Sequence, residues 1–138
     1  GLTLVHDPHE SRATADVIFV HGLGGNSWTT WCWKHDPSMF WPAWLRHEHG
    51  VSHFRMFTFG YNANWRGPDT KLSLLDFAKG LLVQMRGYGD RDSDGEWPIG
   101  KRPIIFVAHS MGGLVVKKVR IVRPSFQRWL LTLVRPIS

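Results

Sequence analysis

Three short apolar runs predict strands, and longer segments of mixed polarity separate them. Asp16–Val20 and Ile104–Ala108 are almost continuously apolar, which is typical of strands buried on both faces of a sheet. His53–Phe59 alternates between polar and apolar residues before it becomes apolar, and it predicts a further strand. Leu2–Val5 is short and fits a strand at the edge of the sheet.

Helical patterns occupy the segments between these runs. A helix before the Ile104 strand either begins at Asp69 or begins at Ser73, which would have Asp76 as its capping partner. Pro42 suits the first turn of a shorter helix, and an apolar run after Ser110 predicts another. Strands and helices thus alternate, which favours an α/β fold with a mostly parallel sheet and helices on both faces. The apolar face of the first helix consists of Leu74, Leu75, Ala78, Leu81, Leu82 and Met85.

Ser110 follows the Ile104–Ala108 strand almost at once, and two glycines and an apolar helical run follow it. Strand, sharp turn and helix would place the Ser110 hydroxyl at the tip of the turn. A serine is a weak nucleophile, and it must stand clear of the backbone to reach a base and a carbonyl carbon together. The residues two before and two after it must be small, because strand and helix nearly collide there. In the pattern G-x-S-x-G the first glycine is replaced here by Ala108, while His109 is the intervening residue and Gly112 and Gly113 follow.

A second glycine-rich turn, His21-Gly22-Leu23-Gly24-Gly25, follows the Asp16–Val20 strand. A dinucleotide-binding fingerprint would need glycine at position 27, where the chain has Ser27. The turn also fits an ordinary loop, or a loop whose backbone N–H points into an oxyanion hole. Because a candidate nucleophile lies downstream, we favour the oxyanion hole. The Leu23 and Met111 amides are the candidate donors, the latter at a helix start.

Composition and charge narrow the classes of function. The chain has 138 residues and is 43 % hydrophobic, so it is at most one domain with a packed core. We recognise no signal peptide and no transmembrane segment. The net charge of +6 lies in the last part of the chain, where residues 111–138 hold six cations and no acid. This basic excess belongs to a tail rather than to a domain, so we expect no nucleic-acid partner.

Metal and cofactor signals are weak. His47, His49 and His53 are more simply explained as a solvated helix end than as metal ligands. Asp90–Gly95 copies the opening of a calcium loop, but its twelfth position is Lys101, which would repel the ion. We therefore expect neither a metal nor a cofactor. The aromatic-dense segment Trp28–Trp44 fits packing against the sheet, with one or two side chains lining an acyl pocket.

The stretches V-I-F-V-H-G-L-G-G and I-I-F-V-A-H-S-M-G-G-L-V-V-K-K resemble the α/β-hydrolase superfamily. Within it the chain resembles the lipase-like serine esterase domains related to the serine active site-containing protein, over about Asp16 to Lys118. The resemblance implies Ser110 as nucleophile, Leu23 and Met111 as oxyanion donors, and an ester or lipid substrate. It also implies an intracellular location at the mitochondrion or endoplasmic reticulum, with membrane association.

The triad order of this fold is serine, acid, histidine, yet no Asp, Glu or His follows Ser110. We therefore expect a sheet truncated after the nucleophile helix and a serine hydrolase by ancestry that is catalytically incomplete. The alternative is a non-catalytic binding module, or the front of a larger multidomain protein. The expected organisation is an edge segment over 1–15, the N-terminal half of a hydrolase domain over 16–119, and a divergent basic tail over 120–138. Ser125–Ser138 could instead form a helix on a membrane surface.

Overall fold

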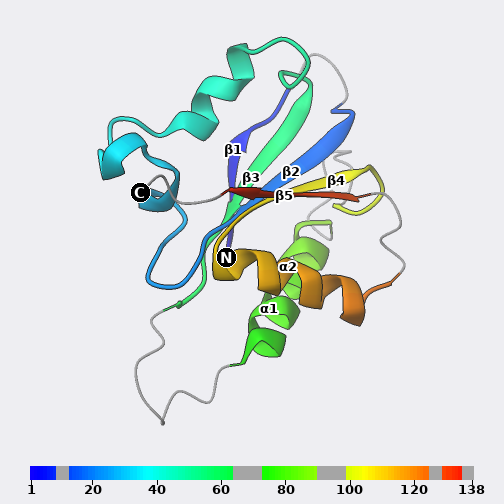
Figure 1. The fold of residues 1–138 in the computed structure, drawn as a ribbon. Coiled ribbons are helices and arrows are strands. Elements are labelled where there is room, and N and C mark those ends of the chain that lie inside the picture. The colour runs from blue at the N-terminus through cyan, green and yellow to red at the C-terminus, as the bar shows by residue number, and fades with distance from the viewer. Residues whose placement is uncertain (9–12, 64–72, 90–98, 125–128, 135–138) are drawn as a thin grey trace.

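The computed structural model describes residues 1–8, 13–63, 73–89, 99–124 and 129–134, the last of these as backbone only. Its centre is a five-stranded sheet in the order β1-β3-β2-β4-β5 (Figure 1). β1 runs antiparallel to β3, and every other neighbouring pair is parallel. The predicted α/β fold with a mostly parallel sheet is confirmed. The strands are β1 (Leu2–His6), β2 (Ala15–Val20), β3 (Phe54–Phe59), β4 (Ile104–His109) and β5 (Trp129–Val134).

The two faces of the sheet are covered by different kinds of helix (Figure 1). The α-helices α1 (Leu74–Gly89) and α2 (Met111–Val122) pack against each other and share one hydrophobic core with Ile18, Phe57 and Phe106. The opposite face packs against Trp31, Phe40 and their neighbours in the segment between β2 and β3. That segment carries three short 3-10 helices, η1 (Thr29–Trp31), η2 (Trp33–His35) and η3 (Trp41–His47).

Topology accounts for this division. The connection from β2 leads to β3 on one side, whereas the connections from β3 to β4 and from β4 to β5 lead the other way across the sheet. Crossovers of one hand that run in opposite directions leave the sheet on opposite faces. The segment η1–η3 therefore covers one face, and α1 and α2 together cover the other. The paths that leave β2 and β4 part here, so the gap beyond their carboxyl ends is the topological switch point, where open α/β sheets bind ligands.

The sequence left open whether the helix before β4 begins at Asp69 or at Ser73, and the contacts at the start of α1 favour Ser73. The Ser73 amide donates to Asp76 Oδ2 at 2.7 Å, and the Asp76 amide donates back to Ser73 Oγ at 3.3 Å. The pair gives the Ser73 N–H an acceptor, and the Asp76 N–H also donates to the Ser73 carbonyl at 3.0 Å. The hydrogen bonds to the Ser73 backbone N–H and hydroxyl lower the pKa of the Asp76 carboxyl.

The end of the chain differs from expectation. The sheet does not stop at β4, because β5 follows α2 and pairs with β4 in parallel from Ile104–Trp129 to His109–Val134. A membrane-surface helix is wrong for residues 129–134, which form this strand. α2 continues to Val122, two residues before Pro124, which cannot lie in a helix interior. The proposed division at residue 120 stays a prediction.

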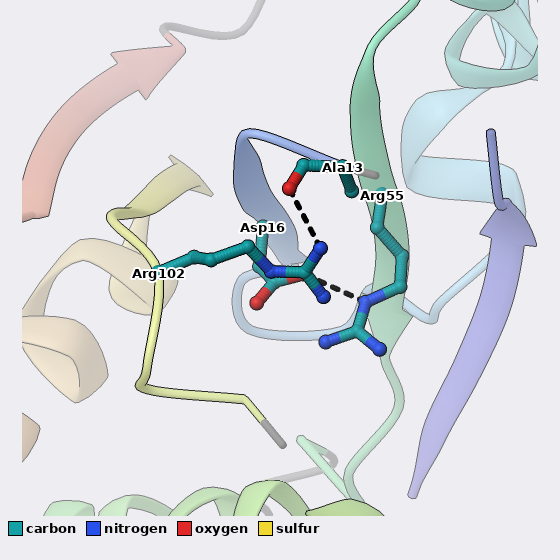
Figure 2. A network of polar contacts seen from close by, with 4 residues as sticks. All are labelled: Ala13, Asp16, Arg55 and Arg102. Carbon is teal, nitrogen blue, oxygen red and sulfur yellow. Dashed lines mark hydrogen bonds and ion pairs between the residues drawn. The ribbon is translucent and has the colours of Figure 1, made fainter. Parts of the chain in front are cut away.

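A buried ion pair ties together the amino ends of the central strands (Figure 2). Arg55 of β3 donates from Nε to Asp16 Oδ1 of β2 at 2.7 Å, and both side chains are almost fully buried. Arg102, just before β4, donates to the Ala13 carbonyl at 2.7 Å and lies 3.9 Å from Asp16 Oδ1. These charges lie at the opposite end of the parallel strands from Ser110.

Candidate active site

Ser110 occupies a backbone conformation that L-residues seldom adopt. Its φ of 53° and ψ of −122° place it at the one-residue turn between β4 and α2. Such a conformation costs on the order of 1–3 kcal/mol, so the surrounding packing must impose it. The turn leaves Ser110 exposed, as the predicted presentation of a nucleophile requires.

Gly112 explains why the turn is sharp. A Cβ on Gly112 would overlap the Val20 carbonyl oxygen and would lie 2.6 Å from the His21 carbonyl oxygen, both of them backbone atoms. The first turn of α2 thus rests directly on the end of β2. Ala108 is fully buried beside Val20, its partner in the sheet, and Gly113 donates to the Ser110 carbonyl at 3.0 Å.

Gly22 brings the two sequence motifs into contact. A Cβ at this position would lie 2.7 Å from the His109 carbonyl oxygen and 2.8 Å from Ser110 Cβ. The glycine-rich loop after β2 therefore packs on the serine turn at the switch point of the sheet. Gly24 has a φ of 70°, which glycine adopts readily, and a hydrogen bond joins Gly25 N–H to the Gly22 carbonyl at 3.1 Å.

The two candidate oxyanion donors are the residues that follow Gly22 and Ser110, the two residues that form this contact. Leu23 follows Gly22 directly, and Met111 is the first residue of α2, whose N–H has no partner within the helix. Across the described part of the chain, neither amide donates to a carbonyl or to a side chain. Leu23 is 54 % exposed at the tip of its loop. Both amides are therefore free to receive an anion.

His21 is held as a neutral ring by contacts on both nitrogens. Nδ1 lies 3.0 Å from the Gly22 carbonyl oxygen, and Nε2 accepts the Tyr61 backbone N–H at 3.2 Å. Nε2 is therefore unprotonated, and Nδ1 carries the proton. Burial lowers the pKa of His21 below its usual 6.5. This histidine is fully buried and engaged, so it is not a base for Ser110.

His109 lies beside Gly22, and its ring meets Trp31 edge-on at 6.5 Å between centroids. Within the ranges that the structure describes, no side chain hydrogen-bonds to Ser110. In this part of the chain Ser110 thus has no base bonded to it, and its role as nucleophile stays a prediction.

The aromatic segment is divided between core and surface: Trp31 and Phe40 are buried against the sheet, as favoured from the sequence, whereas Trp28, Trp33 and Trp44 are about half exposed. Trp31 is 1 % exposed and contacts Phe19 and Trp41 edge-on. Trp28 stacks on Phe40 with centroids 4.0 Å apart but remains half exposed. No contact places Trp28 against the Ser110 turn, so the acyl-pocket role stays a prediction.

No group of three or more His, Cys, Asp or Glu side chains in the described residues is arranged to hold a metal ion. The Asp90–Gly95 stretch lies outside the described residues. In the described part of the molecule no helix is long and apolar enough to cross a bilayer.

Comparison with known proteins decides the family. The profile of the alpha/beta hydrolase family matches residues 17–131. The chain belongs to this family. The chain is also 32 % identical to Protein SERAC1 of Danio rerio over 120 residues, which are 76 % of the chain and 18 % of that protein. Its identity to Protein SERAC1 of Bos taurus and of Homo sapiens is 30 % over 141 residues, 86 % of the chain and 20 % of each relative. The chain spans about a fifth of the length of the curated relatives it matches.

Membership in the alpha/beta hydrolase family agrees with the resemblance drawn from the two glycine motifs and supports a hydrolase-like ancestry. Two contacts were not found from the sequence, one beside the Ser110 turn and one at the opposite end of the sheet. The contact of Tyr61 with His21 depends on a loop that leaves a different strand, and the Asp16–Arg55 pair depends on strand order. The only sign of the ion pair in the sequence is that Asp16 and Arg55 are charged residues within two otherwise largely apolar runs.

Proposed function

We propose that this chain carries the nucleophile and oxyanion hole of a serine hydrolase that acts on carboxylic esters or lipids. The observation that carries the proposal is the strained Ser110 turn, packed against the glycine loop and flanked by two amides without partners. In the reaction, Ser110 Oγ bonds to the ester carbonyl carbon while its proton passes to a base. The carbonyl oxygen becomes an oxyanion, which the Leu23 and Met111 amides stabilise. Collapse breaks the ester C–O bond, and the alcohol leaves with the proton that the base took from Ser110. The acyl group stays bonded to Ser110 until water attacks it and releases it as a carboxylic acid.

We also propose that residues 1–138 by themselves are catalytically incomplete, because residues 111–138 contain no acid and no histidine. Without a base the serine remains a neutral hydroxyl. Oxyanion stabilisation alone still accelerates acyl transfer, with each donor contributing on the order of 10²–10³. Residual, slow reactivity at Ser110 is therefore the expected behaviour. Association with a membrane surface, and location at the mitochondrion or endoplasmic reticulum, stay predictions from the family resemblance.

A fluorophosphonate probe tests this proposal on the full chain. We expect labelling on the order of 10⁴-fold slower than that of a serine hydrolase with a complete triad. Ser110→Ala should abolish the labelling, whereas Ser52→Ala, a serine at the far end of the sheet, should leave it unchanged. Labelling that survives Ser110→Ala would exclude Ser110 as the nucleophile. Labelling at the rate of a complete enzyme would contradict the incomplete site.

The second candidate is a binding module that uses the hydrolase fold without chemistry. The observation that favours it is the lack of any described side chain bonded to Ser110. In a Ser110→Ala chain, a short aliphatic ester should then shift the amide signals of Leu23 and Met111 saturably in an NMR titration. If the ester shifts neither amide signal, the interpretation as an ester-binding module is wrong.

A further inference from the structure

We propose that Tyr61 and His21 are positioning residues that hold the Leu23 amide at the mouth of the Ser110 turn, and that protonation of His21 releases it. This inference rests on the proposed function, because it concerns the same oxyanion loop. Neither residue touches the reacting atoms in this scheme. Their role is to fix the backbone that presents the amide.

Tyr61 contacts His21 in three ways. Its backbone N–H donates to His21 Nε2 at 3.2 Å, and its hydroxyl donates to the His21 carbonyl at 2.6 Å. The two rings also stack, with centroids 4.2 Å apart and an interplanar angle of 12°. His21 in turn contacts the Gly22 carbonyl through Nδ1. These contacts define a brace that consists of Tyr61, His21 and the Gly22 carbonyl.

The brace is anchored in the core rather than in the loop that it holds. The Tyr61 ring also contacts Phe59 of β3 at 5.5 Å and Phe77 of α1 at 4.7 Å between centroids. Burial raises the pKa of the Tyr61 hydroxyl to about 12, so it remains a donor at physiological pH. Two residues on, the Ala63 carbonyl accepts the Gly24 N–H at 3.2 Å. The segment after β3 thus holds Leu23 from both sides, through Gly22 and through Gly24.

The brace works only with a neutral imidazole. A protonated His21 has no lone pair on Nε2, so the Tyr61 N–H would lose its acceptor and meet an N–H instead. Burial is the main cause that lowers the pKa of His21. The backbone hydrogen bonds to Gly22 and Tyr61 partly raise it, and the Gly1 amino group and His109 lower it further. The first turn of α2 offers no acidic group that would stabilise the cation. A group whose pKa is lowered by folding stabilises the folded form above pH 6.5 and loses that contribution as pH falls through the lowered pKa.

NMR on the full chain tests the brace without requiring Ser110 to react. Near neutral pH the ring nitrogens of His21 should show the neutral form with the proton on Nδ1. On acidification, the amide signals of Leu23 and Gly24 should shift with the midpoint of His21 itself, which should lie below 6.5. The same midpoint should appear in a Ser110→Ala chain, so failure of the proposed chemistry and failure of the brace are distinguishable.

Substitution of the tyrosine provides the matched comparison. Tyr61→Phe keeps the ring stack and removes the hydroxyl bond, so we expect the Gly24 amide to exchange with solvent about 3- to 10-fold faster. Tyr88→Phe, in α1, should leave that exchange unchanged. If Tyr61→Phe does not fold, the wild-type titration still decides. Leu23 and Gly24 signals that stay fixed while His21 titrates, or a His21 midpoint at or above 6.5, would overturn the proposal.

Discussion

Replacing Gly112 with alanine should destabilise the protein, although alanine is the better helix former. Gly112 lies in the first turn of α2 and has no positive φ, so its backbone conformation is open to any residue. In a helix, alanine is favoured over glycine by roughly 0.5–1 kcal/mol. The added methyl group, however, would overlap the Val20 carbonyl oxygen and approach the His21 carbonyl oxygen to 2.6 Å.

The magnitude follows from what can move. Ordinary contacts of a Cβ atom begin near 3.4 Å, so relief needs a shift of several tenths of an ångström or more. Both oxygens belong to the backbone at the end of β2, which is paired on both sides, by β3 and by β4. Overpacking of this kind costs roughly 1–3 kcal/mol, and here the helix must move away from the sheet. We therefore expect a net loss of about 1–2 kcal/mol after the gain in helix propensity is subtracted.

Urea unfolding measures this loss, with Gly80→Ala as the matched control. Gly80 lies within α1, and a Cβ there would have no atom within 4 Å. The control should therefore gain about 0.5–1 kcal/mol from helix propensity and lower chain entropy. Opposite signs for the two variants support the packing of α2 against β2. If Gly112→Ala is as stable as the wild type, or shifts in the same direction as Gly80→Ala, the reasoning is refuted.

Three further predictions concern other parts of the molecule. Asp16→Asn leaves the buried Arg55 guanidinium without its carboxylate and should lower the free energy of unfolding, measured in urea, by about 3–5 kcal/mol. The double variant Asp16→Leu, Arg55→Met should lose less, and equal losses would contradict an ion pair. Ser110→Gly should raise the free energy of unfolding by about 1 kcal/mol, because glycine tolerates a positive φ, and a decrease would argue against strain at the turn. In a Tyr88→Phe chain Tyr61 is the remaining tyrosine, and ultraviolet absorbance should show that it ionises with a pKa of about 12. The free energy of unfolding should fall as pH rises above 10.0, the ordinary pKa of a tyrosine. An ionisation at 10.0 would show that Tyr61 is in solvent.

Much of the fold could be predicted from local patterns. Continuous apolar runs predicted β2 and β4, and helical spacing from Leu74 to Met85 predicted α1. The sharp turn at Ser110 followed from one chemical constraint, the need for small residues on both sides of an exposed hydroxyl. The role of the turn in catalysis stays a prediction, because the fold alone does not test it.

Long-range pairing was the part that the sequence could not supply. Strand order determines that Tyr61, after β3, meets His21, after β2, and nothing in either segment's own pattern specifies that neighbour. β5 was missed for a related reason. Its run Trp129–Val134 is apolar and follows a proline, but a short apolar run does not distinguish a strand from a helix until a partner strand is known.

The serine at the turn is best explained by chemistry rather than by stability. Its positive φ costs free energy that glycine would avoid, and in the described residues its hydroxyl has no hydrogen-bond partner that would repay this cost. The packing that imposes the strain comes from Gly22 and Gly112, whose missing side chains let the β2 loop and α2 approach the turn. Two glycines thus hold a serine in a conformation that the fold itself does not need. The hydroxyl is exposed, and in the described residues the nearby Leu23 and Met111 amides donate to no acceptor, which is why we propose that they receive an oxygen that develops negative charge.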